Sequence, residues 1–241
     1  MKLNNIGIVL VRTQEPGNAG AACRAMRNTG ISELILVSPI DFQAKQNRWM
    51  ACGSFDLLKN AETAGSLSEA LSDKGLTVGF TRRTGSTRGP VITLRESLPE
   101  IAAAAEDNKV ALVFGNEMNG LSNEELLQCQ ALVTIPCAPE NPSLNLAQAV
   151  MVCCYELFSY KKKIPRENRL KLAENRLVEH MYGRLTETLA LIGYGNEGDR
   201  KVLDCIIRRL RRIFGRSGLE KRDLDTINGM CTQIQNYRNK L

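Results

Sequence analysis

Short apolar runs alternate with amphipathic segments through the first 160 residues. Five runs rich in leucine and β-branched residues have the length of buried strands, at 6–11, 34–37, 76–81, 110–114 and 132–135. Helical spacing of apolar residues occurs between and after them, at 20–28, 46–58, 66–72, 97–105, 123–129 and 144–160. This alternation predicts an α/β domain with a mostly parallel sheet covered on both faces.

Two local signals predict helix ends within this domain. Gly30 follows the first helical segment and suits the left-handed residue that closes a helix. Ser122 and Glu125 have the spacing of a capping box, so a helix is expected to start just after Ser122.

The pattern changes after residue 160. Residues 161–168 are polar and interrupted by Pro165, which predicts a linker. Beyond it the sequence has helical periodicity at 170–192, 201–214 and 219–237, with glycines between the segments. We therefore expect an α/β domain at 1–160, a linker at 161–168 and a small all-α extension at 169–241.

Charge separates the same two parts. The formal net charge is +6, but residues 1–160 carry a net −3 and residues 161–241 a net +9. A basic extension on a near-neutral body indicates a polyanionic partner, although a solvated helical face would have the same composition. Four arginines of the extension are candidates for contacts with RNA phosphates: Arg208, Arg209, Arg211 and Arg212.

Other features exclude several classes of protein. No apolar run is long enough to span a bilayer, and the N-terminal run is too short for a signal peptide, so we expect a cytoplasmic protein without a membrane partner. The eight cysteines contain no C-x-x-C pair, and His180 is the only histidine. We therefore expect no metal site, and reduced cysteines that pack as small hydrophobic groups.

Three loops at the carboxyl ends of expected strands are candidates for chemistry. They lie at 15–30, 112–122 and 135–150, and they are rich in Gly, Asn, Pro and Ser. Ligands of open α/β sheets bind at these strand ends. Tight turns and helix caps would explain each loop alone but explain the three together less well. The loops lack G-x-G-x-x-G and G-K-[ST], which disfavours a nucleotide-dependent oxidoreductase and excludes a P-loop.

The motifs in these loops resemble the TrmH-type, or SpoU-type, branch of the SPOUT methyltransferases. The first motif contains Asn18, Gly20 and Arg24, and the second runs from Phe114 to Ser122. The third starts at Ile135 and continues through Ser143, Leu144, Asn145, Ala147 and Ala149. The extension resembles the TrmJ group at 182–189, 193–194 and 208–214, a narrower match.

The resemblance implies an S-adenosylmethionine-dependent enzyme that methylates a ribose 2′-hydroxyl of RNA. In the TrmJ group the substrate is nucleotide 32 of the tRNA anticodon loop. It also implies a trefoil knot near the C-terminus of the α/β domain, and a homodimer. The alternatives are an rRNA 2′-O-methyltransferase of the same family and a non-catalytic RNA-binding protein on the same fold.

The resemblance also assigns roles to residues. Arg24 is expected to hold the 2′-oxygen or a neighbouring phosphate, since arginine is a poor base, although proton acceptance stays open. Asn18 would orient Arg24 or the nucleotide, and Glu117 would order loops, contact the partner subunit or favour a helix N-terminus. Ser143 and Asn145 would shape the pocket, cap the next helix, or both. The expected cofactor contacts are Phe80, Thr81, Arg82, Gly115, Ile135, Ser143 and Leu144.

Overall fold

A seven-stranded, wholly parallel sheet forms the centre of the α/β domain. The computed structural model describes residues 1–39, 53–83, 90–160, 170–195, 200–215 and 218–238. The strand order is β3-β2-β1-β6-β4-β7-β5, and every pairing is parallel. The strands are β1 (Ile6–Val11), β2 (Glu33–Val37), β3 (Glu62–Ala64), β4 (Leu76–Phe80), β5 (Val91–Thr93), β6 (Val110–Phe114) and β7 (Ala131–Thr134).

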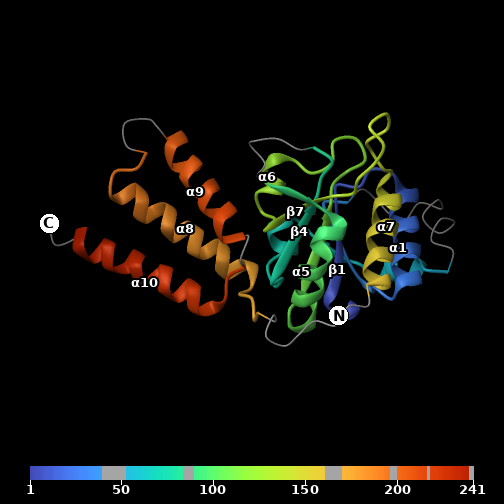
Figure 1. Cartoon of the computed structure of the whole chain (residues 1–241), viewed down its shortest axis with the longest axis horizontal. Helices are drawn as coiled ribbons and strands as arrows, with labels where there is room; N and C mark the ends of the chain where they lie inside the picture. The colour runs from blue at the N-terminus through green and yellow to red at the C-terminus, as the bar shows by residue number, and fades with distance from the viewer. Residues whose placement is uncertain (40–52, 84–89, 161–169, 196–199, 216–217, 239–241) are drawn as a thin grey trace.

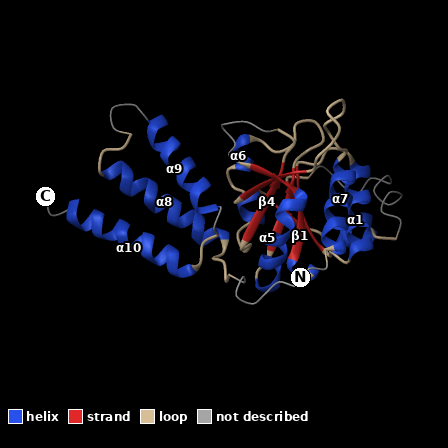
Figure 2. Cartoon of the chain, viewed as in Figure 1, coloured by secondary structure: helices blue, strands red, loops and turns tan. Residues whose placement is uncertain are grey.

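Helices cover both faces of the sheet, as the sequence predicts, because alternate residues of each strand point to opposite sides. Ile8 belongs to the core that packs under α1 (Pro16–Thr29), α3 (Phe55–Lys59), α5 (Leu94–Asp107) and α7 (Leu146–Ser159). Val9 belongs to a second core under α4 (Leu67–Ala70) and α6 (Asn123–Leu126). The strands thus form a central layer between helices (Figure 2).

Three further helices form the extension. They are α8 (Asn175–Leu191), α9 (Arg200–Gly215) and α10 (Lys221–Arg238). A small core of their own holds them together, and it includes Val178, Met181, Tyr182 and Leu224. The extension occupies one end of the long axis of the molecule, and α1 and α7 lie together at the other (Figure 1).

The expected elements are found with few changes. All five predicted strands are present, and Gly30 closes α1 with φ +80°. The Ser122–Glu125 capping box begins α6. The sequence missed β3 and β5, because three residues are too few to show a period. Of the helix expected at 46–58, residues up to 52 lie outside the described residues, as does the linker at 161–168.

The trefoil knot stays a prediction. Within the described part of the chain, no helix has both the length and the apolar character needed to cross a membrane.

Candidate active site

The three candidate loops meet at the carboxyl edge of the sheet, because parallel strands end on the same side. The second and third loops, together with the residues that follow β4, surround an open cleft that encloses about 790 Å³ of space, part of it open to solvent. The ends of β4, β6 and β7 form its floor. All seven residues expected to contact a cofactor line this cleft: Phe80, Thr81, Arg82, Gly115, Ile135, Ser143 and Leu144.

The floor of the cleft is closely packed. The rings of Phe80 and Phe114 stack with their centroids 4.3 Å apart. Next to them, a Cβ at Gly115 would overlap the backbone of Gly120 and Leu121. The loop after β6 can therefore fold back on itself only because residue 115 has no side chain.

Glu117 in this loop binds the segment that leads into α1. Its carboxylate accepts hydrogen bonds from the backbone N–H of Gln14 at 3.0 Å and of Glu15 at 3.3 Å. It also accepts one from Nδ2 of Asn18, at 2.9 Å. One carboxylate thus joins the loop after β6 to the start of α1, which is the loop-ordering role that the sequence left open.

Asn145 extends this network to the third loop. Its Nδ2 donates to Oδ1 of Asn18 at 2.9 Å. Its own Oδ1 accepts from the backbone N–H of Ala147 and Gln148 and so caps α7. Of the two roles that the sequence left open for Asn145, the structure shows the cap of α7, and the shaping of the pocket stays a prediction. Ser143 lines the cleft and is exposed, and the cap of α7 is Asn145 alone.

Arg24 lies on the exposed side of α1, in the same helix as Asn18. It has no hydrogen bond or ion pair to any residue of the described ranges. The side chain of Asn18 is bonded to Glu117 and Asn145 instead. The network therefore holds the helix that carries Arg24 and leaves its guanidinium available to a ligand.

Arg12 was not among the residues that the sequence singled out, although it directly follows β1. Its backbone has φ +51°, and its guanidinium makes a two-pronged ion pair with the buried carboxylate of Glu125. Glu125 also accepts from the backbone N–H of Ser122 at 2.7 Å. This ion pair ties the end of β1 to α6. Its position at a strand end was the one signal in the sequence that could have indicated this role, because its acidic partner is 113 residues away.

The four arginines of the extension are not equivalent. Arg208, Arg209 and Arg212 are exposed on α9. Arg211 instead donates to both carboxylate oxygens of Glu179, at 2.6 and 2.7 Å, and lies over the ring of Tyr182. The charge of Arg211 is thus paired inside the extension, and a contact between Arg211 and an RNA phosphate stays a prediction.

Cysteine and metal chemistry find no support in the described part of the chain. Burial raises the pKa of Cys23, Cys129 and Cys154 to about 12, so these thiols stay protonated. Within the same residues, no three His, Cys, Asp or Glu side chains are grouped as metal ligands.

Comparison with known proteins identifies the family. The profile of the SpoU rRNA methylase family matches residues 5–155. The chain belongs to the SpoU rRNA methylase family. The profile of the tRNA methyltransferase TrmJ C-terminal domain matches residues 176–241, which cover the three helices of the extension.

Individual members of this family match over nearly the whole chain. A tRNA (cytidine/uridine/adenosine-2′-O-)-methyltransferase TrmJ from Pseudomonas aeruginosa is 38% identical, across 97% of this chain and 95% of its own. The tRNA (cytidine/uridine-2′-O-)-methyltransferase TrmJ of Escherichia coli K12 is 36% identical, across 99% of both. The crystal structure of TrmJ from Z. mobilis ZM4 superposes with a TM-score of 0.81 at 28% identity, across 95% of this chain and 98% of that one.

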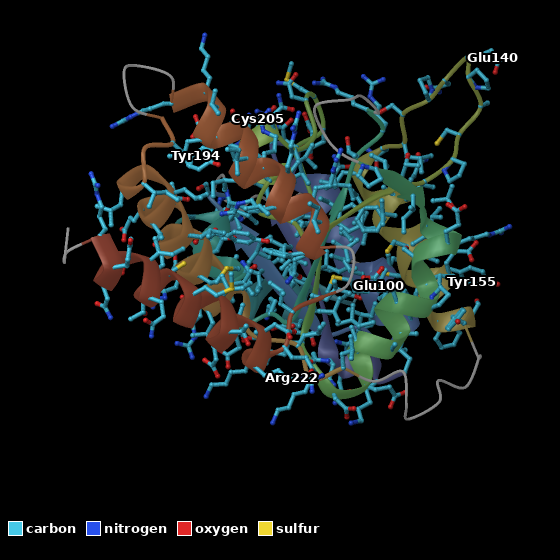
Figure 3. The ribbon with its side chains drawn as sticks, turned by 60° about the vertical axis from the view of Figure 1, so that its left-hand side comes forward. Glu100, Glu140, Tyr155, Tyr194, Cys205 and Arg222 are labelled. Carbon is cyan, nitrogen blue, oxygen red and sulfur yellow. The ribbon has the colours of Figure 1, made fainter. Side chains whose placement is uncertain are left out.

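The network around Glu117 predicts a specific cost in stability. Glu117→Ala removes the acceptor of three N–H groups and should lower the free energy of unfolding by about 1–3 kcal/mol. Glu140→Ala is the matched control, because Glu140 is exposed at the outer tip of the third loop (Figure 3). Its effect should stay within about 0.5 kcal/mol. Urea unfolding measures both, and equal losses would show that the carboxylate does not hold the loops together.

Proposed function

We propose that this chain transfers a methyl group from S-adenosylmethionine to a ribose 2′-hydroxyl of tRNA, at nucleotide 32 of the anticodon loop. The observation that carries the proposal is the chain of hydrogen bonds from Glu117 through Asn18 to Asn145, which joins all three motifs beside the cleft that Glu117 lines. The two curated relatives named above are tRNA 2′-O-methyltransferases. Their similarity to this chain extends through the three-helix extension, which matches the TrmJ C-terminal domain.

The cleft suits an adenosyl group. Its floor is aromatic at Phe80 and Phe114, and Gly115 lets the loop after β6 fold back on itself beside them. Small-molecule sites of this kind are largely apolar and have a few polar groups that fix orientation. Thr81 and Ser143 supply hydroxyls at its edge. When bound, S-adenosylmethionine supplies an electrophilic methyl on a sulfonium.

The residues of the chain must position and stabilise a weak nucleophile. A ribose hydroxyl is a weak acid, so its oxygen needs alignment with the methyl and support for developing negative charge. Arg24 provides that support, since a guanidinium keeps its charge and only donates. Asn18, Asn145 and Glu117 hold the helix that presents Arg24 and act as positioning residues.

The extension favours tRNA over rRNA as the substrate. It matches the TrmJ C-terminal domain, and residues 161–241 have a net charge of +9. Arg208, Arg209 and Arg212 are exposed on one helix and can meet phosphates. We expect the enzyme to act in the cytoplasm, where tRNA is available. A purely RNA-binding role is disfavoured because the unpaired Arg24 and the complete cleft have no use in it.

We also propose a homodimer formed through α7, along with the family's trefoil knot. Met151, Val152, Tyr155 and Phe158 are apolar and exposed on this helix. Their spacing places them on one face of the helix, and the exposure of such an apolar face to water is unfavourable. Tyr155 projects outward from the domain (Figure 3). A second copy of α7 would bury this face.

Arg24→Ala should lower the turnover of tRNA by about a hundredfold to a thousandfold, since it removes a donor to the developing charge. The control is Arg27→Ala, because Arg27 is exposed on the same helix and pairs with Asp56. Transfer of a radiolabelled methyl measures the rate, and calorimetry with chelator present measures cofactor affinity. Affinity should be unchanged in both variants. Wild-type turnover by Arg24→Ala would refute the catalytic assignment.

Removing two phosphate contacts should flatten the salt dependence of tRNA binding. For the double variant Arg208→Ala/Arg212→Ala we expect the log–log slope to fall by about 1.4 to 1.8, at roughly 0.7–0.9 per contact. Lys59→Ala/Arg95→Ala removes the same charge from exposed positions of the α/β domain and serves as control. Binding is measured at several salt concentrations. If both double variants change the slope equally, the extension is not the RNA-binding surface.

Charge on the α7 face should dissociate the dimer. Tyr155→Glu/Phe158→Glu places two carboxylates where apolar surface would be buried, so light scattering should give half the wild-type mass. Leu191→Glu/Ile192→Glu changes two exposed apolar residues at the end of α8 and should leave the mass unchanged. A wild-type protein that is already monomeric, or a Tyr155/Phe158 variant that stays dimeric, would contradict this interface.

A further inference from the structure

Asn108 bonds the α/β domain to the start of the extension. It follows α5 and is 9% exposed. Its Nδ2 donates to the carbonyl of Leu170 at 2.9 Å and of Ala104 at 3.0 Å. Its Oδ1 accepts from the backbone N–H of Leu172 at 2.9 Å. One buried amide therefore uses both of its donors and its acceptor on α5 and on the chain that leads into the extension.

The segment 170–176, here named the strap, is bonded to both parts of the molecule. On the α/β side, the backbone N–H of Asn175 donates to the carbonyl of Lys74 at 2.8 Å, and that of Arg176 to Ser72 at 3.1 Å. On the other side, the N–H of Ala173 donates to the carbonyl of Leu219 at 2.7 Å. A strap held on both sides leaves little freedom for a hinge.

A second attachment lies at the end of α9, where the helix meets the α/β domain (Figure 1). A Cβ at Gly215 would lie 2.6 Å from the carbonyl oxygen of Gln130, closer than real side chains come. Gln130 is itself fixed to β4, since its backbone N–H donates to the carbonyl of Thr77 and its Oε1 accepts from the N–H of Thr77. Only glycine lets α9 approach the sheet this closely.

Two attachments at different places restrict rotation in a way that one cannot. The strap fixes the extension at one place, and the close approach of Gly215 to Gln130 fixes it at a second. Gly215 also ends the helix that carries Arg208 and Arg212, so this contact sets the place of the RNA-binding side chains directly. The orientation of α9 thus follows from contacts made by Asn108 and Gly215.

We propose that Asn108 and Gly215 are positioning residues that hold the extension in one orientation, so that bound RNA reaches the cleft in a single register. The inference rests on the proposed function. A loosened extension would keep its charges and still bind RNA, but it would present the target ribose to the cleft in many orientations. Misplacement of about 1 Å can cost a hundredfold in rate. Loss of orientation should therefore lower kcat much more than it weakens binding.

The kinetic test compares two Gly→Ala substitutions in helices of the extension. Gly215→Ala pushes α9 from Gln130, whereas a Cβ at Gly229 in α10 meets nothing within 4 Å. For Gly215→Ala we expect kcat on tRNA to fall at least tenfold, with the Kd for tRNA within threefold and cofactor affinity unchanged. Gly229→Ala should match wild type in all three. Unchanged kcat, or a loss confined to Kd, would overturn the proposal.

Hydrogen exchange tests the attachment without any activity. In Asn108→Ala and in Gly215→Ala, the strap amides of Leu172, Asn175 and Arg176 should exchange at least tenfold faster, while the amides of β6 stay protected. Should Asn108→Ala also lose protection in β6, Gly215→Ala decides alone. Strap amides that exchange at the wild-type rate would overturn the proposal. Faster strap exchange in an enzyme whose wild type does not methylate tRNA would refute the proposed function and leave the attachment standing.

Discussion

The carboxylate of Glu117 joins the loop after β6 to the start of α1, and the arrangement of the three motif loops depends on this link. The start of α1 presents two backbone N–H groups and the amide of Asn18 toward one point. Without this acceptor the donors would have to bond to water, and the link between the loop after β6 and α1 would be lost. A single carboxylate satisfies all three, and Asn18 passes the constraint on to Asn145 at the start of α7. The helix that carries Arg24 and the loops after β6 and β7 are thereby held as one unit.

This convergence is possible because every strand of the sheet is parallel. Parallel strands end on one side, so loops far apart in sequence gather at the same edge. The apolar faces of the strands are covered by helices on both sides, which leaves the edge as the place where polar side chains and glycines can form a site. The loop after β6 shows how closely the chain is packed at this edge, since Gly115 has no room for a side chain. The fold thus creates the cleft before any catalytic group is considered.

The sequence was sufficient to predict those features that have a local motif or a regular spacing. The five long strands, the cap at Gly30 and the Ser122 capping box follow from spacing alone, and motif resemblance placed all seven proposed cofactor residues around one cleft. Contacts between distant residues left no such signature. Neither the ion pair of Arg12 with Glu125 nor that of Arg211 with Glu179 could be found by periodicity, because the partners are far apart in the chain. The strands β3 and β5 were too short to detect.

The proposed reaction modifies one atom of one tRNA nucleotide. The most direct test incubates the purified full chain with labelled S-adenosylmethionine and unmodified tRNA, then locates the label by nuclease digestion and mass spectrometry of the nucleosides. The predicted result is a single methyl on the ribose 2′-oxygen of nucleotide 32. A methyl on a base, or a tRNA that acquires no methyl, would contradict it.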